Sequence, residues 1–178
     1  MNARSHVLVL AVYLSTRGFA FVLFESPLSP IDWAVKDIRR TGRKHDRCLF
    51  SIAELVDRYQ PSLLVLQDTS ATGTPRVRRI RTLNSAIIEL AESGGIGTIA
   101  FSRGEVMRAF ASVGVTTKRQ LAEAIAAHIP AFERYLPPLR KPWMSEDSRM
   151  SLFDAAALAL TFFQSPSGGG EQAAMTSV

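Results

Sequence analysis

The sequence predicts an α/β domain in which a five-stranded mixed sheet carries helices on both faces. Three apolar segments follow one another at the start of the chain, and helical and strand patterns alternate after them. This order indicates a mixed sheet covered on both sides. The chain has 178 residues, of which 47% are hydrophobic and 21% are charged. It is therefore long enough for a single domain with a sizeable core.

The first three strands are predicted from the apolar segments near the amino terminus. Residues 6–13 are apolar without alternation, which is typical of a strand buried on both faces. Residues 18–25 form a second apolar segment after a short turn, so we expect the two segments to pair as a hairpin. Residues 31–35 supply a third strand, after Pro27 and Pro30 set the connection.

Helices and strands are expected to alternate in the middle of the chain. A helix is predicted from about residue 48 to residue 59, because its apolar residues recur at spacings of three and four, and Pro61 ends it. Residues 63–67 form a fourth, buried strand, and residues 96–101 form a fifth. Between these strands lies a helix whose apolar face is formed by Ile80, Leu83, Ile87 and Leu90.

The later helices are marked by their first residues. Ser102 with Glu105, and Thr117 with Gln120, have the spacing of a capping box, so each pair is expected to begin a short helix. A proline-rich loop then precedes a last helix that continues through residues 154–163.

One domain over residues 1–164 is expected, followed by a Ser/Gly-rich disordered tail over residues 165–178. The single cysteine, Cys48, excludes an internal disulfide and a cysteine zinc cluster, so a reducing, cytoplasmic setting is expected. No stretch approaches the roughly 20 apolar residues that a membrane span needs. The sequence therefore predicts no membrane partner.

Basic residues give the chain a net charge of +5 and a pI near 9.9, which is compatible with a polyanionic partner. They gather in two connections, and both groups can be interpreted either as solvated faces or as a nucleic-acid-binding surface. The members considered for binding are Arg43 and Lys44 in the first, and Arg76, Arg78, Arg79 and Arg81 in the second.

Three segments together resemble one known family. Residues 13–17 (YLSTR) are similar to an Asp-Pro-Gly-Ser-Arg turn after a first strand, and residues 102–121 are similar to a stretch in which a Gly and an Ala-x-Lys-x-Gln-Val run join two helices. Residues 154–160 (DAAALAL) look like a last-helix signature of an acidic residue followed by Ala, Ala-Leu-Ala. In order and spacing, these segments resemble the RuvC-type Holliday-junction resolvases of the ribonuclease H-like superfamily, over roughly residues 6–163.

The resemblance implies a ribonuclease H-like fold, a homodimer and a nuclease that acts on branched DNA. It also implies carboxylates at the ends of the first and fourth strands and on the last helix, which would hold two Mg²⁺ (or Mn²⁺) ions about 4 Å apart. Such hard ions require oxygen ligands.

The sequence departs from this pattern at the first two of these places. Tyr13 stands at the end of the first strand, where a phenol with an ordinary pKa near 10 is a poor ligand. Gln67, a neutral amide, stands at the end of the fourth strand with Asp68 beside it. Asp68 can replace it only if the strand has already ended, because neighbours on a strand face opposite ways. Tyr13 and Gln67 are interpreted as polar fillers of a former site.

The last helix keeps an acidic residue, Asp154. Asp147 precedes it by seven residues and shares its face if the helix already extends there, and Glu146 is an alternate. Lys118 matches a family lysine near the site. Each of these residues also has a purely structural interpretation. Asp154 can interact favourably with the helix dipole, Glu146 or Asp147 can cap the helix, and Lys118 can be solvated.

Three functions follow from these residues. The first is a nucleic-acid-binding protein for structured or branched DNA with a degraded catalytic site. The second is an active Mg²⁺-dependent endonuclease that uses Asp68, Asp147 and Asp154 as metal ligands. The third is a protein-interaction scaffold. The two tryptophans, Trp33 and Trp143, are expected to pack within the fold rather than to stack on bases.

Overall fold

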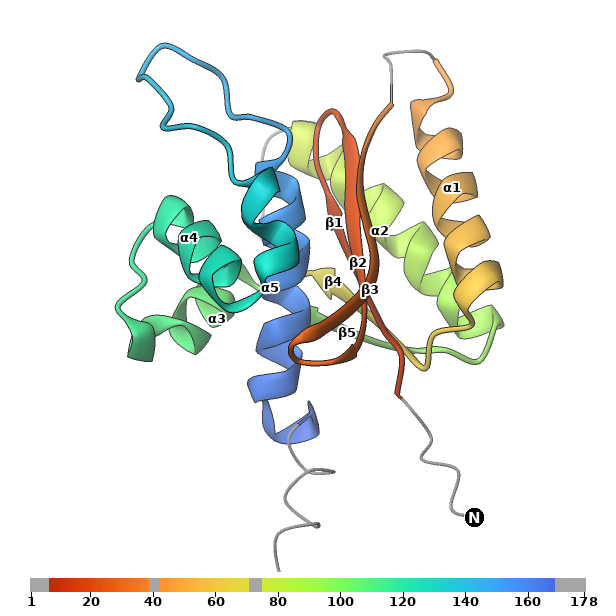
Figure 1. The fold of residues 1–178 in the computed structure, drawn as a ribbon. Helices are drawn as coiled ribbons and strands as arrows, with labels where there is room; N and C mark the ends of the chain where they lie inside the picture. Colours follow the sequence, from red (N-terminus) through yellow and green to blue (C-terminus); the bar gives the residue numbers. More distant parts are fainter. Residues whose placement is uncertain (1–6, 39–41, 71–74, 169–178) are drawn as a thin grey trace, which may run out of the picture.

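The computed structural model describes residues 7–38, 42–70 and 75–168, and its centre is a five-stranded sheet in the order β3-β2-β1-β4-β5 (Figure 1). Strands β1 to β3 pair antiparallel, whereas β1, β4 and β5 run parallel. The predicted mixed sheet is confirmed. The strands are β1 (Val9–Leu14), β2 (Gly18–Ser26), β3 (Ser29–Asp37), β4 (Leu63–Gln67) and β5 (Gly97–Phe101).

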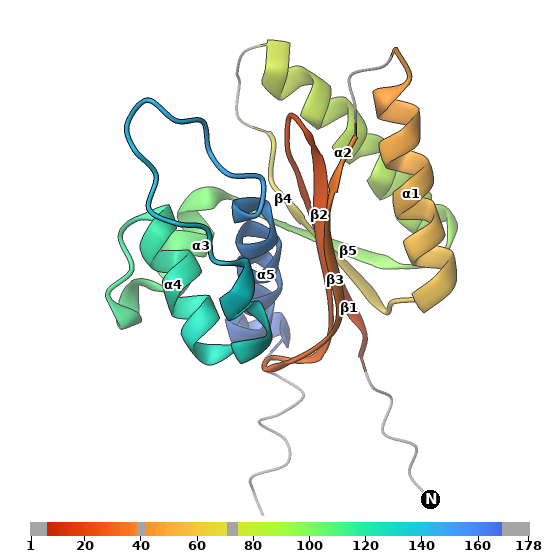
Figure 2. The same ribbon diagram turned by 45° about the horizontal axis from the view of Figure 1, so that its top comes forward.

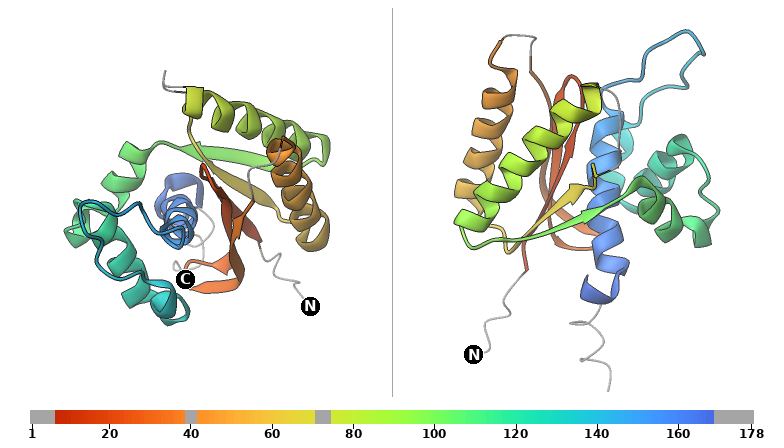
Figure 3. Two further views of the ribbon diagram at one scale, coloured as in Figure 1. Left: turned by 90° about the horizontal axis from the view of Figure 1, so that it is seen from above. Right: turned by 180° about the vertical axis from the view of Figure 1, so that it is seen from behind.

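Helices cover both faces of the sheet, as the views in Figures 2 and 3 show, with α1 and α2 on one side and α3, α4 and α5 on the other. The α-helices are α1 (Lys44–Tyr59), α2 (Pro75–Ser93), α3 (Arg103–Ala109), α4 (Lys118–His128) and α5 (Met150–Gln164). Two short 3-10 helices, η1 (Ala111–Val113) and η2 (Pro130–Tyr135), flank α4.

The two central strands explain the unbroken apolar runs of the sequence. Val9 and Ala11 of β1 face α5, while Leu10 and Val12 face α1 and α2, and all four are fully buried. Successive side chains of a strand point to opposite faces, so a strand between two helical layers has no solvent-facing position. The α5 helix is buried along most of its length because it lies between the sheet and the helices α3 and α4.

Gly18 begins β2 where the chain leaves no room for a side chain. A Cβ atom at this position would lie 1.9 Å from the backbone oxygen of Lys36 on β3. The β1–β2 turn closes next to it, with the backbone N–H of Ser15 donating to the Gly18 oxygen over 2.9 Å. This glycine is therefore required by the close approach of two strands.

Several element boundaries differ from the predicted ones. The α1 helix begins at Lys44 rather than near residue 48, and β3 is longer than residues 31–35. The last helix begins at Met150, so Asp147 precedes it and the condition for a shared helical face with Asp154 is not met. Both predicted capping boxes are confirmed.

The predicted tail, residues 165–178, falls mostly outside the described residues and stays a prediction. Within the described part of the chain, no helix combines the length and apolar character needed to cross a membrane.

Candidate functional site

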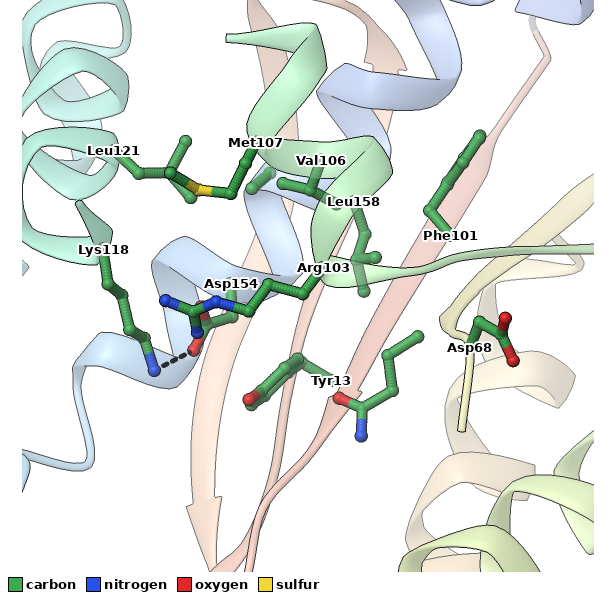
Figure 4. A pocket seen from close by; sticks show the side chains of 12 residues that line it. Tyr13, Asp68, Phe101, Arg103, Val106, Met107, Lys118, Leu121, Asp154 and Leu158 are labelled. Atoms are coloured by element: carbon green, nitrogen blue, oxygen red, sulfur yellow. Dashed lines mark ion pairs between the residues drawn. The ribbon is translucent and has the colours of Figure 1, made fainter. Parts of the chain in front are cut away.

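A pocket of about 190 Å³ opens where β1 and β4 end, on the face covered by α3, α4 and α5 (Figure 4). Val12 pairs with Leu66 in parallel register, so the next residues, Tyr13 near the end of β1 and Gln67 at the end of β4, lie side by side. Asp154 reaches the same pocket from α5. The polar residues that line the pocket are Tyr13, Gln67, Asp68, Arg103, Lys118 and Asp154.

Asp154 is the carboxylate in the centre of this site. Its side chain is only 11% exposed, because α5 packs closely against the sheet. Burial disfavours the charged form and raises the pKa of Asp154 to about 6, although the nearby Lys118 acts in the opposite direction. Asp154 therefore changes charge close to neutral pH.

Lys118 is the cation that contacts Asp154, and it begins α4 directly after the Thr117 cap. Its Nζ lies 2.7 Å from Asp154 Oδ2 and 2.8 Å from Glu146 Oε2, and it lies 5.7 Å from the centre of the Tyr13 ring. Burial alone would lower the pKa of Lys118, but the two carboxylates outweigh it and the pKa is raised. The Lys118 ammonium thus forms ion pairs with both Asp154 and Glu146.

Tyr13 and Gln67 complete the floor of the pocket without adding charge. Burial and the charge of Asp154 raise the pKa of the Tyr13 phenol, so it is neutral at physiological pH. Gln67 Oε1 is buried and has no hydrogen-bond partner among the described residues. The Gln67 backbone oxygen accepts a hydrogen bond from Asn84 Nδ2 over 3.0 Å, which ties β4 to α2.

Asp68 lies at the rim but is turned away from the charged centre. The strand ends at Gln67, so the side chain of Asp68 need not point to the face opposite that of Gln67. Figure 4 nevertheless shows the Asp68 carboxylate pointing away from Asp154 and Lys118. Its Oδ1 accepts a hydrogen bond from the backbone N–H of Ser70 over 2.8 Å. This contact makes Asp68 a turn residue of the β4–α2 connection.

Asp147 is not among the residues that line the pocket. Arg149 holds it through its side chain at 2.7 Å and through its backbone N–H at 2.9 Å. These hydrogen bonds lower the pKa of the Asp147 carboxyl. Asp147 shapes the turn that enters α5, and the structure does not bring it together with Asp68 and Asp154.

The donor set does not fit a pair of divalent ions. Among the described residues, no group of three or more His, Cys, Asp or Glu side chains is placed to hold a metal ion. The pocket offers one buried carboxylate, and an ammonium of the chain already lies against it. Mg²⁺ is held in proteins by carboxylates and other oxygens, and a pair of such ions needs several of them.

The first basic cluster lies at the beginning of α1. Arg43 is exposed, whereas Lys44 is half-buried and donates through Nζ to the backbone oxygen of Thr16 in the β1–β2 turn. Lys44 thereby fixes the turn that follows Tyr13. Arg43 faces solvent directly before the first turn of α1.

The second cluster lies in the first turns of α2. Arg78 and Arg79 are exposed, whereas Arg81 donates through Nε to the backbone oxygen of Thr69 over 3.0 Å. The side chain of Arg76 lies outside the described residues. The cluster therefore combines solvent-facing charge with one arginine that supports the β4–α2 connection.

Arg103 is a pocket residue that the sequence did not single out. It directly follows the Ser102 cap at the end of β5, so the capping box places it at the rim. The sequence did contain a signal for Arg103. A residue that follows both a strand end and a helix cap is expected at the same edge of the sheet as Tyr13 and Gln67.

The strand order and the two helical layers define a ribonuclease H-like fold. Among solved structures, the chain is similar to Thermus thermophilus RuvC in complex with a Holliday junction substrate, with 16% identity, a TM-score of 0.63, and coverage of 89% of this chain and 94% of that one. It is also similar to a structure of Thermus thermophilus RuvC, with 15% identity, a TM-score of 0.65, and coverage of 88% and 93%. The fold is thus RuvC-like. No protein-family model and no curated protein matches the chain.

Proposed function

We propose that this protein binds structured or branched DNA without metal-dependent cleavage. The observation that carries the proposal is the pair of neutral side chains, Tyr13 and Gln67, at the strand ends, which leaves Asp154, bound to Lys118 over 2.7 Å, as the buried carboxylate of the pocket. The resembled family also has a lysine near its site, so the missing carboxylates at these two positions, rather than the lysine, argue against metal binding.

The charge of the pocket supports this proposal. Two-metal cleavage of a phosphodiester needs anionic oxygens that position both ions and neutralise their charge. Here Tyr13 and Gln67 are neutral, and two carboxylates share one ammonium. Arg103 adds further positive charge to the lining. The site is better suited to contact a backbone phosphate directly than to collect cations.

Binding is supported by the exposed arginines at the same end of the molecule. Arg43, directly before α1, and Arg78 and Arg79 in the first turns of α2 are exposed, and Figure 1 shows the first turns of both helices at the same end of the molecule. The solved RuvC structure with a Holliday junction gives the branched ligand that we infer for this chain.

The test compares binding and cleavage on a synthetic four-way DNA junction. We expect the natural protein to bind equally well with Mg²⁺, with Mn²⁺ and with a chelator, and to cleave in none of these conditions. The double variant Tyr13→Asp/Gln67→Glu should gain Mn²⁺ binding in calorimetry, and adding Asp154→Ala to it should remove that gain.

Two results would contradict the proposal. Robust metal-dependent cleavage by the natural protein that disappears with Asp154→Ala would show a working nuclease site around Asp154. Absence of any junction binding at low salt would leave the protein as an interaction scaffold.

A further inference from the structure

The loop that joins η2 to α5, residues 136–149, exposes large apolar side chains at its tip; we refer to it as the connecting loop. Trp143 is 78% exposed, Leu139 is 77% exposed and Met144 is 52% exposed. The prediction that both tryptophans pack within the fold holds for Trp33, which contacts the Phe132 ring, but is wrong for Trp143.

The base of the connecting loop is fixed on both sides. Arg119 of α4 donates to the backbone oxygen of Pro137 at one end. At the other end, Arg17 Nη2 donates to Ser145 Oγ over 3.4 Å, and Glu146 is bound to Lys118. The tip, residues 138–144, is therefore an exposed arm on a base that is anchored beside the pocket, where Glu146 contacts Lys118.

The tip combines a cationic and an aromatic character. Arg140 and Lys141 precede Trp143 and are exposed, and Lys141 Nζ lies 5.4 Å from the centre of the Trp143 ring. An exposed indole has a large apolar surface in contact with water, and such exposure marks contact sites. Aromatic rings beside basic side chains are the groups that hold unstacked bases and their phosphates.

The connecting loop lies where a nucleic acid would also meet other basic side chains. Figures 1 and 2 both show the connecting loop rising at the same end of the molecule as the first turns of α1 and α2. Arg43, Arg78 and Arg79 are exposed there. A polyanion that lies along this end meets the exposed arginines, the pocket and the Trp143 arm together.

We propose that Trp143 stacks on an unpaired base at the branch point of a DNA junction, while Arg140 and Lys141 contact the adjoining phosphates. This inference rests on the proposed function and specifies the feature of the DNA that the connecting loop recognises. The cationic end of the molecule favours a nucleic acid over an apolar partner, because each exposed arginine there would attract phosphates.

The experiment uses a four-way junction that carries 2-aminopurine at the branch point, in a chelator-containing buffer. Binding of the natural protein should quench the 2-aminopurine fluorescence. Trp143→Ala should abolish the quench and lower junction affinity by at least about fivefold, the lower bound for the loss of one base–aromatic stack. Affinity for a linear duplex of the same length should change much less.

Two further variants make the comparison specific. Trp143→Phe keeps a stacking ring and should retain the quench and most of the affinity. Phe50→Ala removes an aromatic ring on α1 that is 66% exposed, outside the connecting loop, and should leave both unchanged. Because Trp143 is exposed, all variants should melt like the natural protein.

The outcomes separate this inference from the proposed function. Equal junction affinity and quenching in Trp143→Ala, with binding still weakened by Arg78→Ala, would overturn the stacking role and leave DNA binding standing. Absence of junction binding by the natural protein would overturn both. Cosedimentation with phosphatidylglycerol vesicles that requires Trp143, without any quench on DNA, would assign the connecting loop to a membrane surface instead.

Discussion

Lys118 Nζ and Asp154 Oδ2 lie 2.7 Å apart where α4 meets α5, and both side chains are mostly buried, at 18% and 11% exposure. In an ion pair this buried, the attraction between the charges and the loss of their hydration are both large. The pKa of Asp154 is raised despite its partner, so the loss of hydration is the larger effect for this carboxylate.

Replacing Lys118 by methionine should destabilise the protein in a pH-dependent way. Removing one partner of a buried pair leaves an uncompensated charge, so we expect a loss of about 2–3 kcal/mol in the free energy of unfolding near pH 8. Well below the raised pKa of Asp154, the carboxyl takes up a proton and the loss should shrink. Urea denaturation at about pH 8 and about pH 5 measures both values.

The matched control is Lys36→Met, which removes an exposed lysine from β3. A change at such a surface position should stay within about 0.5 kcal/mol at either pH. An equal loss for Lys118→Met at both pH values would show that the lost contact is packing rather than charge.

Asp154 should titrate with a midpoint at a pH of about 6 in the folded protein. The unfolded value is about 3.9, so the folded state binds this proton more tightly. The stability that this proton contributes is therefore complete below the unfolded pKa and is lost as the pH rises through about 4 to about 6. By NMR titration of side-chain carboxyl carbons, Asp147 should move the other way, because Arg149 lowers its pKa.

A stability comparison checks the same titration independently. As the pH rises over this window, the natural protein should lose stability relative to Asp154→Asn, by up to roughly 3 kcal/mol for a shift of about two pKa units. A midpoint near 4 for Asp154, or a stability difference that does not depend on pH, would show that Lys118 fully offsets the burial.

Junction binding should depend on salt through the exposed arginines. Each neutralised phosphate releases counterions, so Arg78→Ala and Arg79→Ala should each reduce the slope of log affinity against log salt by about one. The measurement is a titration of the four-way junction between about 50 and about 200 mM salt. Arg58→Ala, which removes an exposed arginine from the last turn of α1, is the control and should keep the full slope.

The sheet and the helix starts were predictable because local patterns determine them. Ser102 and Thr117 form capping boxes with residues three positions later, so four residues decide where α3 and α4 begin. The start of α1 was misjudged for the opposite reason. Its first residues are basic, and Arg43 at the cap makes no side-chain hydrogen bond to the helix.

The site was predictable only in part. Strand order and helix packing place Tyr13, Gln67 and Asp154 around one pocket. The contact of Lys118 with Glu146 depends on how the connecting loop folds back over the pocket, and no residue spacing encodes that path. The packed position predicted for Trp143 was wrong. A large aromatic side chain usually packs inside a fold, but the connecting loop holds Trp143 in solvent.

The ammonium shared by Asp154 and Glu146 has a consequence for how the domain is assembled. A site that relied on dissolved ions would gain its final geometry only after metal uptake, and its stability would follow the metal supply of the surroundings. Lys118 is tethered to the same chain, so it meets its carboxylates at a high effective concentration. Folding of α4, α5 and the connecting loop should therefore proceed alike in metal-poor and metal-rich surroundings.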